Sequence, residues 1–158
     1  TPSVALSLTG TDNVASGAVR AIEAPLGWTE HYDNGGLYDT GAHPAFITAT
    51  RAGWYSVSGR IQWAADDETT QPQRRVLSIV TGTSSSTDPR YAARDDARFI
   101  EDGTPFLQSV DAVVRVAVGD RIWLEGSQTN PDADILSVTA PDALDLRSAN
   151  FRGVWLGA

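Results

Sequence analysis

Residues 51–63, RAGWYSVSGRIQW, contain the pattern that decides the fold. Every second residue from Tyr55 to Trp63 is apolar or glycine, and the residues between them are serine, arginine or glutamine. Because the side chains of a strand alternate between its two faces, this pattern predicts a half-buried antiparallel strand. The side chains expected to face the core are Tyr55, Val57, Ile61 and Trp63.

Similar patterns recur along the chain. In SVDAVVRVAV the core-facing series is Val110, Ala112, Val114 and Val116, and in RIWLE it is Ile122 and Leu124, with Trp123 and Glu125 on the other face and a turn at VGD between the two segments. Further strands are expected at residues 4–8, 18–22, 46–49, 75–80, 135–139 and 151–156. Turn-forming residues separate these segments at intervals of roughly 8–15 residues, as in a sandwich or barrel. The prediction is a single all-β domain over residues 1–158, with about ten strands and no long helix.

Several polar stretches have the composition of exposed loops. Residues 81–89, TGTSSSTDP, are rich in small polar residues. Three acidic stretches are expected to be loop tips: DDE at 66–68, RDDAR at 94–98 and IEDGTP at 100–105.

The overall composition excludes several classes of protein. A chain of 158 residues can bury about 68–70% of its unfolded surface without a metal or a disulfide, and it contains no cysteine. Its formal net charge of −8 argues against nucleic acid or an anionic membrane as a partner, because both attract clusters of basic residues. The apolar runs are also too short to form a membrane-spanning helix.

Catalytic and metal-binding patterns are weak. His31 and His43 lie in a turn-rich region near Asp33 and Asp39, but their spacing fits no zinc pattern. TGTSSS lacks the strand-turn-helix setting of a serine nucleophile, and DNGGLYDTG lacks the lysine and the helix of a phosphate-binding loop. We therefore expect these residues to be structural.

Carboxylates are the remaining candidates for chemistry, since paired acids hydrolyse glycosides and oxygen-rich loops bind calcium. They occur at Asp66, Asp67 and Glu68, at Asp95 and Asp96, and at Asp132 and Asp134. The stretch NPDAD at 130–134 has part of a calcium-loop spacing but lacks its glycine and its distal glutamate. Solvated loops are the expectation, with no enzyme activity, no cofactor and no metal.

Five segments follow one another in a recognisable order: YDNGGLYDTG at 32–41, the opening strand at 51–63, QRRVLSIVTG at 73–82, VRVAVGDRIWLEGSQ at 114–128 and ANFRGVWLG at 149–157. This order resembles the signature of complement-type globular heads, members of the tumour-necrosis-factor-like jelly-roll superfamily. The matching positions are Asn34, Tyr38, Asp39, Gly53, Tyr55, Gly119, Asp120, Gln128 and Phe151. The particular variant is most similar to heads found in bacteriophage particles.

The resemblance implies an antiparallel jelly-roll sandwich packed as a homotrimer. Such an assembly would cover sheet edges and an apolar flank that a single jelly roll leaves open. Trp54 and Trp123 fall on the faces opposite their core neighbours, so a subunit interface is one expected place for them. The alternative is that they cap the ends of the sandwich.

Two non-enzymatic functions follow from the resemblance, and both place the protein at the virion surface. In the first, the trimer is a capsid accessory protein that reinforces a bacteriophage shell, with residues 1–13 as a docking arm. In the second, it is the receptor-binding head of a tail or fibre that recognises a host surface glycan, for which the candidates are Trp28, Tyr32 and Tyr91, expected to be exposed loop aromatics that stack on a sugar. A complete gene product of 158 residues favours the first function, and an excised domain favours the second.

Two further alternatives stay open. A cellular origin is compatible with the resemblance, because bacteria carry similar heads on spores and surface fibres. Hydrolysis of a surface polysaccharide by a pair of aspartates is the only enzymatic alternative, and it is the least favoured one.

Overall fold

The computed structural model describes residues 1–8, 11–23, 28–39, 41, 45–64, 73–83, 89–99, 105–130, 135–139 and 150–158. These residues form twelve β-strands in two sheets, and the predicted all-β antiparallel fold is confirmed. No helix in this part of the chain is long and apolar enough to cross a membrane.

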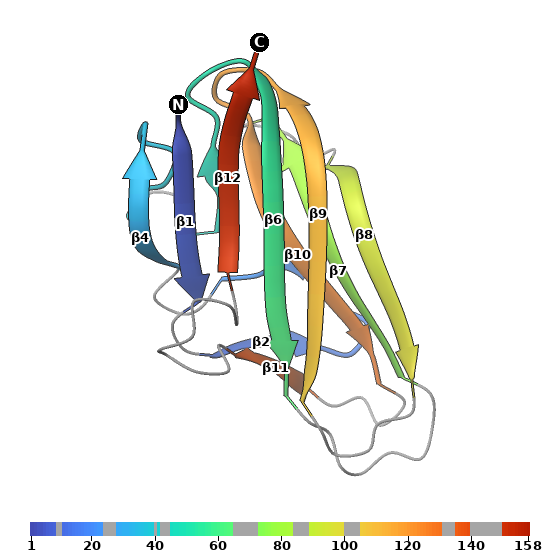
Figure 1. Ribbon diagram of the computed structural model, residues 1–158. Helices are drawn as coiled ribbons and strands as arrows, with labels where there is room; N and C mark the ends of the chain where they lie inside the picture. Colours follow the sequence, from blue (N-terminus) through green and yellow to red (C-terminus); the bar gives the residue numbers. More distant parts are fainter. Residues whose placement is uncertain are drawn as a thin grey trace.

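Sheet A has seven strands. They are β1 (Ser3–Leu8), β2 (Thr11–Ala15), β4 (Trp28–Asn34), β6 (Gly53–Trp63), β9 (Phe106–Val116), β11 (Ile135–Thr139) and β12 (Asn150–Gly157). The broad part of the sheet has the order β9-β6-β12-β1-β4 (Figure 1). The pair β2 and β11 joins the far end of β6, where Val138 lies opposite Trp63.

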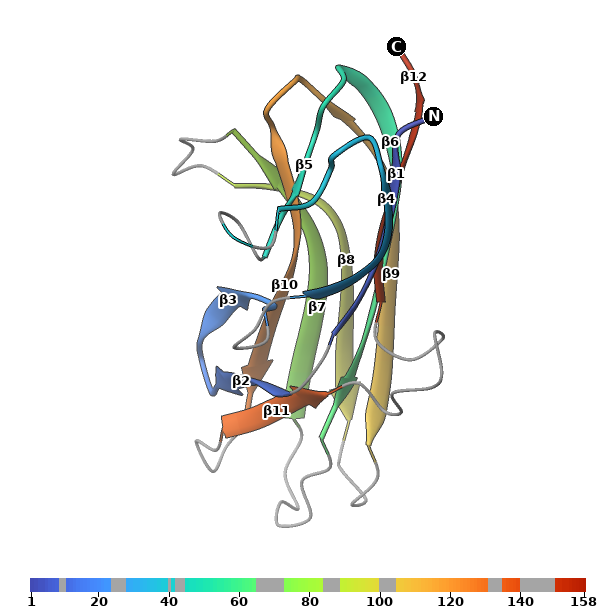
Figure 2. The ribbon, with the colours of Figure 1, turned by 90° about the vertical axis from the view of Figure 1, so that its left-hand side faces the viewer.

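Sheet B has five strands. They are β3 (Val19–Ala21), β5 (Ile47–Thr48), β7 (Gln73–Gly82), β8 (Arg90–Phe99) and β10 (Arg121–Thr129). Its order is β3-β10-β7-β8, with β5 paired to the start of β10. Figure 2 shows β10, β7 and β8 as a second layer packed on sheet A.

The strand at the centre of the prediction is β6, and its predicted alternation is confirmed. Tyr55, Val57, Ile61 and Trp63 are buried, while Trp54 and Ser56 on the other face are exposed. Gly59 shares the buried face, and a Cβ built on it would lie 2.2 Å from Leu124 Cδ2 of sheet B. The two sheets therefore approach most closely where β6 carries no side chain.

The predicted alternation of residues 110–116 and 122–125 is confirmed in β9 and β10. The turn between them carries the chain from sheet A to sheet B, because β9 pairs with β6 and β10 pairs with β7. Gly119 has a φ of 86°, which a residue with a side chain rarely adopts. The strands expected at residues 4–8, 18–22, 46–49, 75–80, 135–139 and 151–156 correspond to β1, β3, β5, β7, β11 and β12.

The prediction of a loop at residues 94–98 is wrong. Residues 94–98, RDDAR, lie within β8, which pairs with β7 along its length. Ala93, Asp95 and Ala97 are half-buried while Arg94 and Asp96 are exposed, so burial alternates along the strand although the half-buried face includes a charged residue. The sequence did not reveal this alternation, because charged residues dominate the segment and alanine side chains are only weakly apolar. The other two acidic stretches lie outside the described residues, apart from Pro105.

The N-terminal segment is not a free docking arm. Residues 3–8 form β1, which lies between β12 and β4 inside sheet A. Val4, Leu6 and Leu8 are each at most 1% exposed. Removing these residues from the sheet would expose the core, so the expectation for residues 1–13 is wrong for this strand.

A polar network lies between the sheets at the start of β7. Arg75 is fully buried, its guanidinium lies 5.8 Å from the ring of Trp63, and its Nη2 donates a hydrogen bond to Gln73 Oε1 at 3.2 Å. Gln108 accepts a bond from Trp63 Nε1 at 2.9 Å and donates to the backbone oxygens of Arg75 and Asp95. The stacking of the Arg75 cation on the Trp63 ring and the hydrogen bonds of the Gln108 amide reduce the cost of burying these groups.

Candidate interaction surfaces

The residues that carry the family resemblance form turns and core contacts. The carboxylate of Asp33 accepts hydrogen bonds from the N–H groups of Leu37 and Tyr38, both at 2.9 Å, and closes the turn that contains Gly35 and Gly36. Asn34 Nδ2 donates to the backbone oxygen of Thr1 at 3.2 Å. This segment ties the start of the chain to the end of β4.

Tyr38 anchors the same turn to the core. Its hydroxyl donates to Trp28 O and accepts from Trp28 N, both at 2.9 Å. Burial raises the pKa of the Tyr38 phenol, and the hydrogen bond to the Trp28 backbone partly offsets this. The neighbouring Asp39 Oδ1 accepts a bond from Gly41 N at 2.9 Å.

Gly53 and Tyr55 begin β6 under tight constraints. Gly53 has a φ of 135°, and a Cβ there would lie 2.2 Å from the backbone oxygen of Gly157. The Tyr55 hydroxyl donates to Arg51 O at 3.0 Å and closes the preceding turn. The role of this pair is to fix where β6 starts.

The late signature residues are structural as well. Asp120 Oδ2 accepts a bond from Ala117 N at 2.8 Å across the turn at Gly119. Gln128 Nε2 donates to Val14 O at 3.0 Å, and Phe151 packs on Trp28 with ring centroids 5.8 Å apart. These signature residues therefore form turns and core contacts of the fold.

The outer face of sheet A carries exposed apolar side chains on three adjacent strands. Trp54 of β6 is 44% exposed, Val113 of β9 is 59% exposed and Leu156 of β12 is 57% exposed. In the strand register Ser56 lies opposite Val113 and Val154, and Trp54 lies opposite Arg115. We call this group of three the sheet A patch.

Trp123 does not belong to this patch. It lies on the outer face of sheet B, where it packs edge-on against Phe46 at 5.4 Å, and Arg121 lies 5.2 Å from the Phe46 ring. Trp54 and Trp123 therefore lie on opposite faces of the sandwich. One contiguous interface patch cannot contain both of them.

The three aromatic residues considered for glycan binding are also dispersed. Trp28 is only 2% exposed, and its Nε1 donates to Ile22 O at 3.0 Å, so the expectation that it is an exposed loop residue is wrong. Its position in β4 turns the ring toward Phe151 in the core. Tyr32 and Tyr91 are exposed, but they lie on strands of different sheets.

Tyr91 is held by a partner on its own sheet. Its hydroxyl donates to Glu125 Oε1 at 2.6 Å, and this hydrogen bond raises the pKa of the Tyr91 phenol. Tyr32, in contrast, lines a pocket of about 190 Å³ on the outer face of sheet A, together with Ser7, His31 and Arg152. Within that pocket His31 Nε2 and Ser7 Oγ are 2.7 Å apart.

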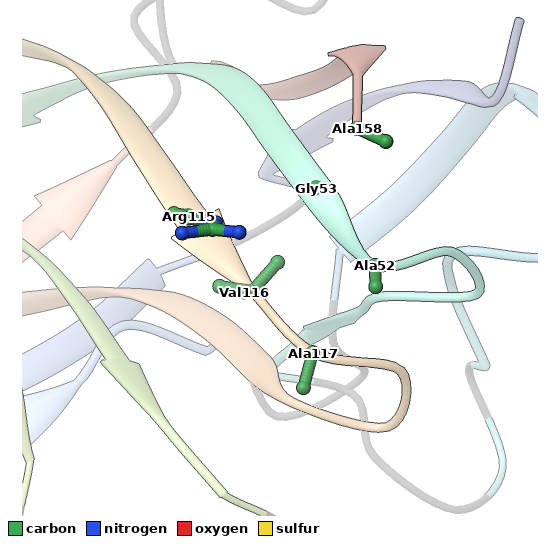
Figure 3. A pocket seen from close by; sticks show the side chains of 6 residues that line it. All are labelled: Ala52, Gly53, Arg115, Val116, Ala117 and Ala158. Atoms are coloured by element: carbon green, nitrogen blue, oxygen red, sulfur yellow. The ribbon is translucent and has the colours of Figure 1, made fainter.

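Two further pockets meet at Arg115, at the end of the sandwich where β9 leaves sheet A. The larger, about 330 Å³, is lined by Ala52, Gly53, Val116 and Ala158 as well as Arg115 (Figure 3). The second, about 160 Å³, is lined by Arg115, Arg90, Thr81, Thr83 and Asp120. Gly53 and Asp120 belong to the signature, but no motif pointed to Arg90 or Arg115, because they lie on strands that only the folded structure brings together.

No group of three metal-ligating side chains occurs among the described residues. Asp33 and Asp39 form turn hydrogen bonds, and His31 lies beside Ser7. Asp96 pairs with Arg74, whose hydrogen bond lowers the pKa of the carboxyl, and Asp95 lies beside it in β8. His43, Asp66, Asp67, Glu68, Asp132 and Asp134 lie outside the described residues.

No protein-family model and no curated protein sequence matches the chain. Solved structures do match over nearly its full length. The globular domain of zebrafish complement 1qA covers 99% of this chain and 98% of its own, with a TM-score of 0.59 and 13% identity. Eiger TNF from S. frugiperda covers 99% and 94%, with a TM-score of 0.63 and 14% identity. Murine APRIL covers 98% of both chains, with a TM-score of 0.63 and 13% identity. This chain therefore has the jelly-roll fold that the complement 1q globular head shares with tumour-necrosis-factor-like proteins.

Proposed function

We propose that the chain is the subunit of a non-enzymatic homotrimer that decorates the capsid of a bacteriophage and reinforces its shell. The observation that carries the proposal is the sheet A patch, Trp54, Val113 and Leu156, on a sheet face that nothing covers within the described part of the chain. A face of this kind is a natural subunit interface, because burying large apolar side chains stabilises association.

The number of subunits comes from the sequence resemblance. Complement-type heads assemble as trimers, and a closed threefold arrangement covers apolar surface without leading to open-ended polymers. The net charge of −8 favours solubility of a protein displayed at high local density.

The assignment to a virion comes from the signature variant described above, with Ala52-Gly53 before Tyr55 and Gly119-Asp120 before the late strand. Decoration predicts regular trimers over the shell in electron cryomicroscopy of particles from the source. Antibody label confined to a tail or fibre tip would contradict decoration and support adsorption. Absence of the protein from particles would overturn both virion roles.

A receptor-binding head is the second candidate, and the pocket beside Tyr32 is the observation that favours it. An exposed tyrosine ring offers a stacking surface for a sugar, while His31, Ser7 and Arg152 line the same pocket with polar groups. Pockets for small ligands commonly combine an apolar surface with a few polar groups that fix orientation.

The glycan hypothesis is tested by binding to host surface polysaccharide. Replacing Tyr32→Ala should reduce binding at least tenfold, whereas Tyr91→Ala, an exposed tyrosine of the other sheet, should leave it unchanged. Equal binding by wild type and Tyr32→Ala would contradict the hypothesis. Neither candidate function involves turnover, and release of sugars from host polysaccharide by the intact protein would contradict both.

A further inference from the structure

The smaller of the two pockets that meet at Arg115 brings together residues from both sheets. Thr81 is near the end of β7, Arg90 begins β8, and Arg115 is near the end of β9. Thr81 and Arg90 are direct partners in the register of sheet B. Arg115 belongs to sheet A and completes the pocket from the opposite layer.

Neither Arg90 nor Arg115 has a structural partner within the described residues, a condition that Arg98 and Arg152 share, but these two are the arginines that line one pocket together. Other arginines have such a partner: Arg20 pairs with Asp12 at 3.0 Å, Arg74 pairs with Asp96, and Arg121 lies over Phe46. Arg90 and Arg115 are both exposed, and no ion pair or ring contact engages either side chain. Two cations at one pocket repel each other unless an anion lies between them.

The other groups at the pocket suit an anion. Thr83 adds a hydroxyl donor, while the Thr81 hydroxyl donates to the backbone oxygen of Arg90 at 3.4 Å and ties the two strand ends together. Asp120 is the acidic residue that lines the pocket, and its Oδ2 already accepts the hydrogen bond from Ala117 N. Guanidinium groups form bidentate, charge-assisted hydrogen bonds with sulfate, phosphate and carboxylate.

We propose that Arg90 and Arg115 bind an oxyanion group, a sulfate, phosphate or carboxylate, at the end of the sandwich. A volume of about 160 Å³ suits one such group with little else attached. The adjoining pocket of about 330 Å³, which shares Arg115, leaves room for a sugar ring that bears the group (Figure 3). The ligand is therefore either a free inorganic anion or an acidic substituent on a saccharide.

The inference goes beyond the proposed function and needs only one subunit. The site lies at the end of the sandwich, while the sheet A patch provides the proposed interface. Arg115 lies opposite Trp54 of the sheet A patch in the strand register, so the particle mass of each arginine variant is measured beside its anion binding. Loss of anion binding at an unchanged particle mass separates the two proposals.

The test is titration of the full chain with sodium sulfate, and separately with a sulfated polysaccharide, at constant ionic strength. Binding should saturate, each of Arg90→Gln and Arg115→Gln should weaken it about threefold to tenfold, and the double variant should abolish it. Arg98→Gln is the matched control, because it removes the same charge from the same strand about 26 Å away, at roughly 3.3 Å per residue.

Each outcome bears on the proposal. Binding of sulfate alone, lost in the double variant, supports the site and identifies a free anion as the ligand. Much tighter binding of the polysaccharide, with the same sensitivity, identifies an acidic saccharide. Absence of saturable binding, or an equal loss in Arg98→Gln, overturns the proposal, since the interaction would then be absent or merely long-range attraction.

Discussion

Gly59 shows at the scale of one residue how closely the sheets pack. Leu124 occupies the space that a side chain at position 59 would need, and Leu124 is fully buried. Replacing Gly59→Ala should lower the free energy of unfolding by about 1–3 kcal/mol, because Leu124 must shift within a filled core. Ser58→Ala, on the other face of β6, should change it by less than about 0.5 kcal/mol. Urea unfolding measures both, and equal stability of the two variants would contradict this account of the core.

Tyr38 makes a second prediction at this scale. Replacing Tyr38→Phe keeps the ring but removes the hydroxyl that pairs with both backbone groups of Trp28. The loss should cost about 1–3 kcal/mol of unfolding free energy, because a buried N–H and a buried C=O lose their partner. Tyr32→Phe, at an exposed position, is the control. A Tyr38→Phe variant as stable as wild type would show that water replaces the hydroxyl.

At the scale of the element, the β7–β8 hairpin has a pH-dependent contact on its exposed face. Arg74 Nε donates to Asp96 Oδ1 at 2.9 Å, and this bond lowers the pKa of Asp96 in the folded state. A lowered folded-state pKa means that the stabilisation is fully present above the unfolded value of about 3.9. It is lost as the pH falls through the lower folded value.

The hairpin prediction is measured by urea unfolding of wild type and Arg74→Gln at several pH values. Wild type should be the more stable protein at pH 7, and the difference should shrink as the pH falls below about 4. A difference that stays constant down to pH 2 would mean that Arg74 stabilises the hairpin by packing alone.

The elements also show how far the sequence could predict this structure. β6 was predictable because large apolar residues alternate with polar ones over the whole strand. β8 was not, because its half-buried positions Ala93, Asp95 and Ala97 carry no large apolar side chain and charged residues lie between them. Trp28 was misplaced because the turn-forming residues before it indicated a loop, whereas hydrogen bonds to Tyr38 and packing on Phe151 draw it into the core.

Candidate sites were less predictable than strands for a physical reason. The pocket at Arg90 and Arg115 forms where the start of β8 in sheet B meets the end of β9 in sheet A. A local sequence pattern does not show which strand ends lie together in the folded chain. The resemblance pointed to residues that form turns and core contacts, because these determine the fold. Exposed residues that bind partners can differ between proteins that share one fold, so residues that determine the fold do not identify them.

At the scale of the whole molecule, the central claim concerns the sheet A patch. Val113→Asp places a charge at an exposed position of β9 and should prevent subunit association without unfolding the chain. Val19→Asp, at an exposed position of sheet B, makes the same chemical change away from the patch and should leave association intact. Circular dichroism checks that both variants keep the all-β fold. Equal effects on association would remove the patch from the interface.

The most direct measurement is the mass of the wild-type particle by light scattering behind a sizing column at micromolar concentration. The account predicts about three times the chain mass of 16.9 kDa, and a mass near that of one chain for Val113→Asp. A wild-type particle with the mass of one chain would contradict the interface. A particle with the mass of two chains would contradict the threefold arrangement.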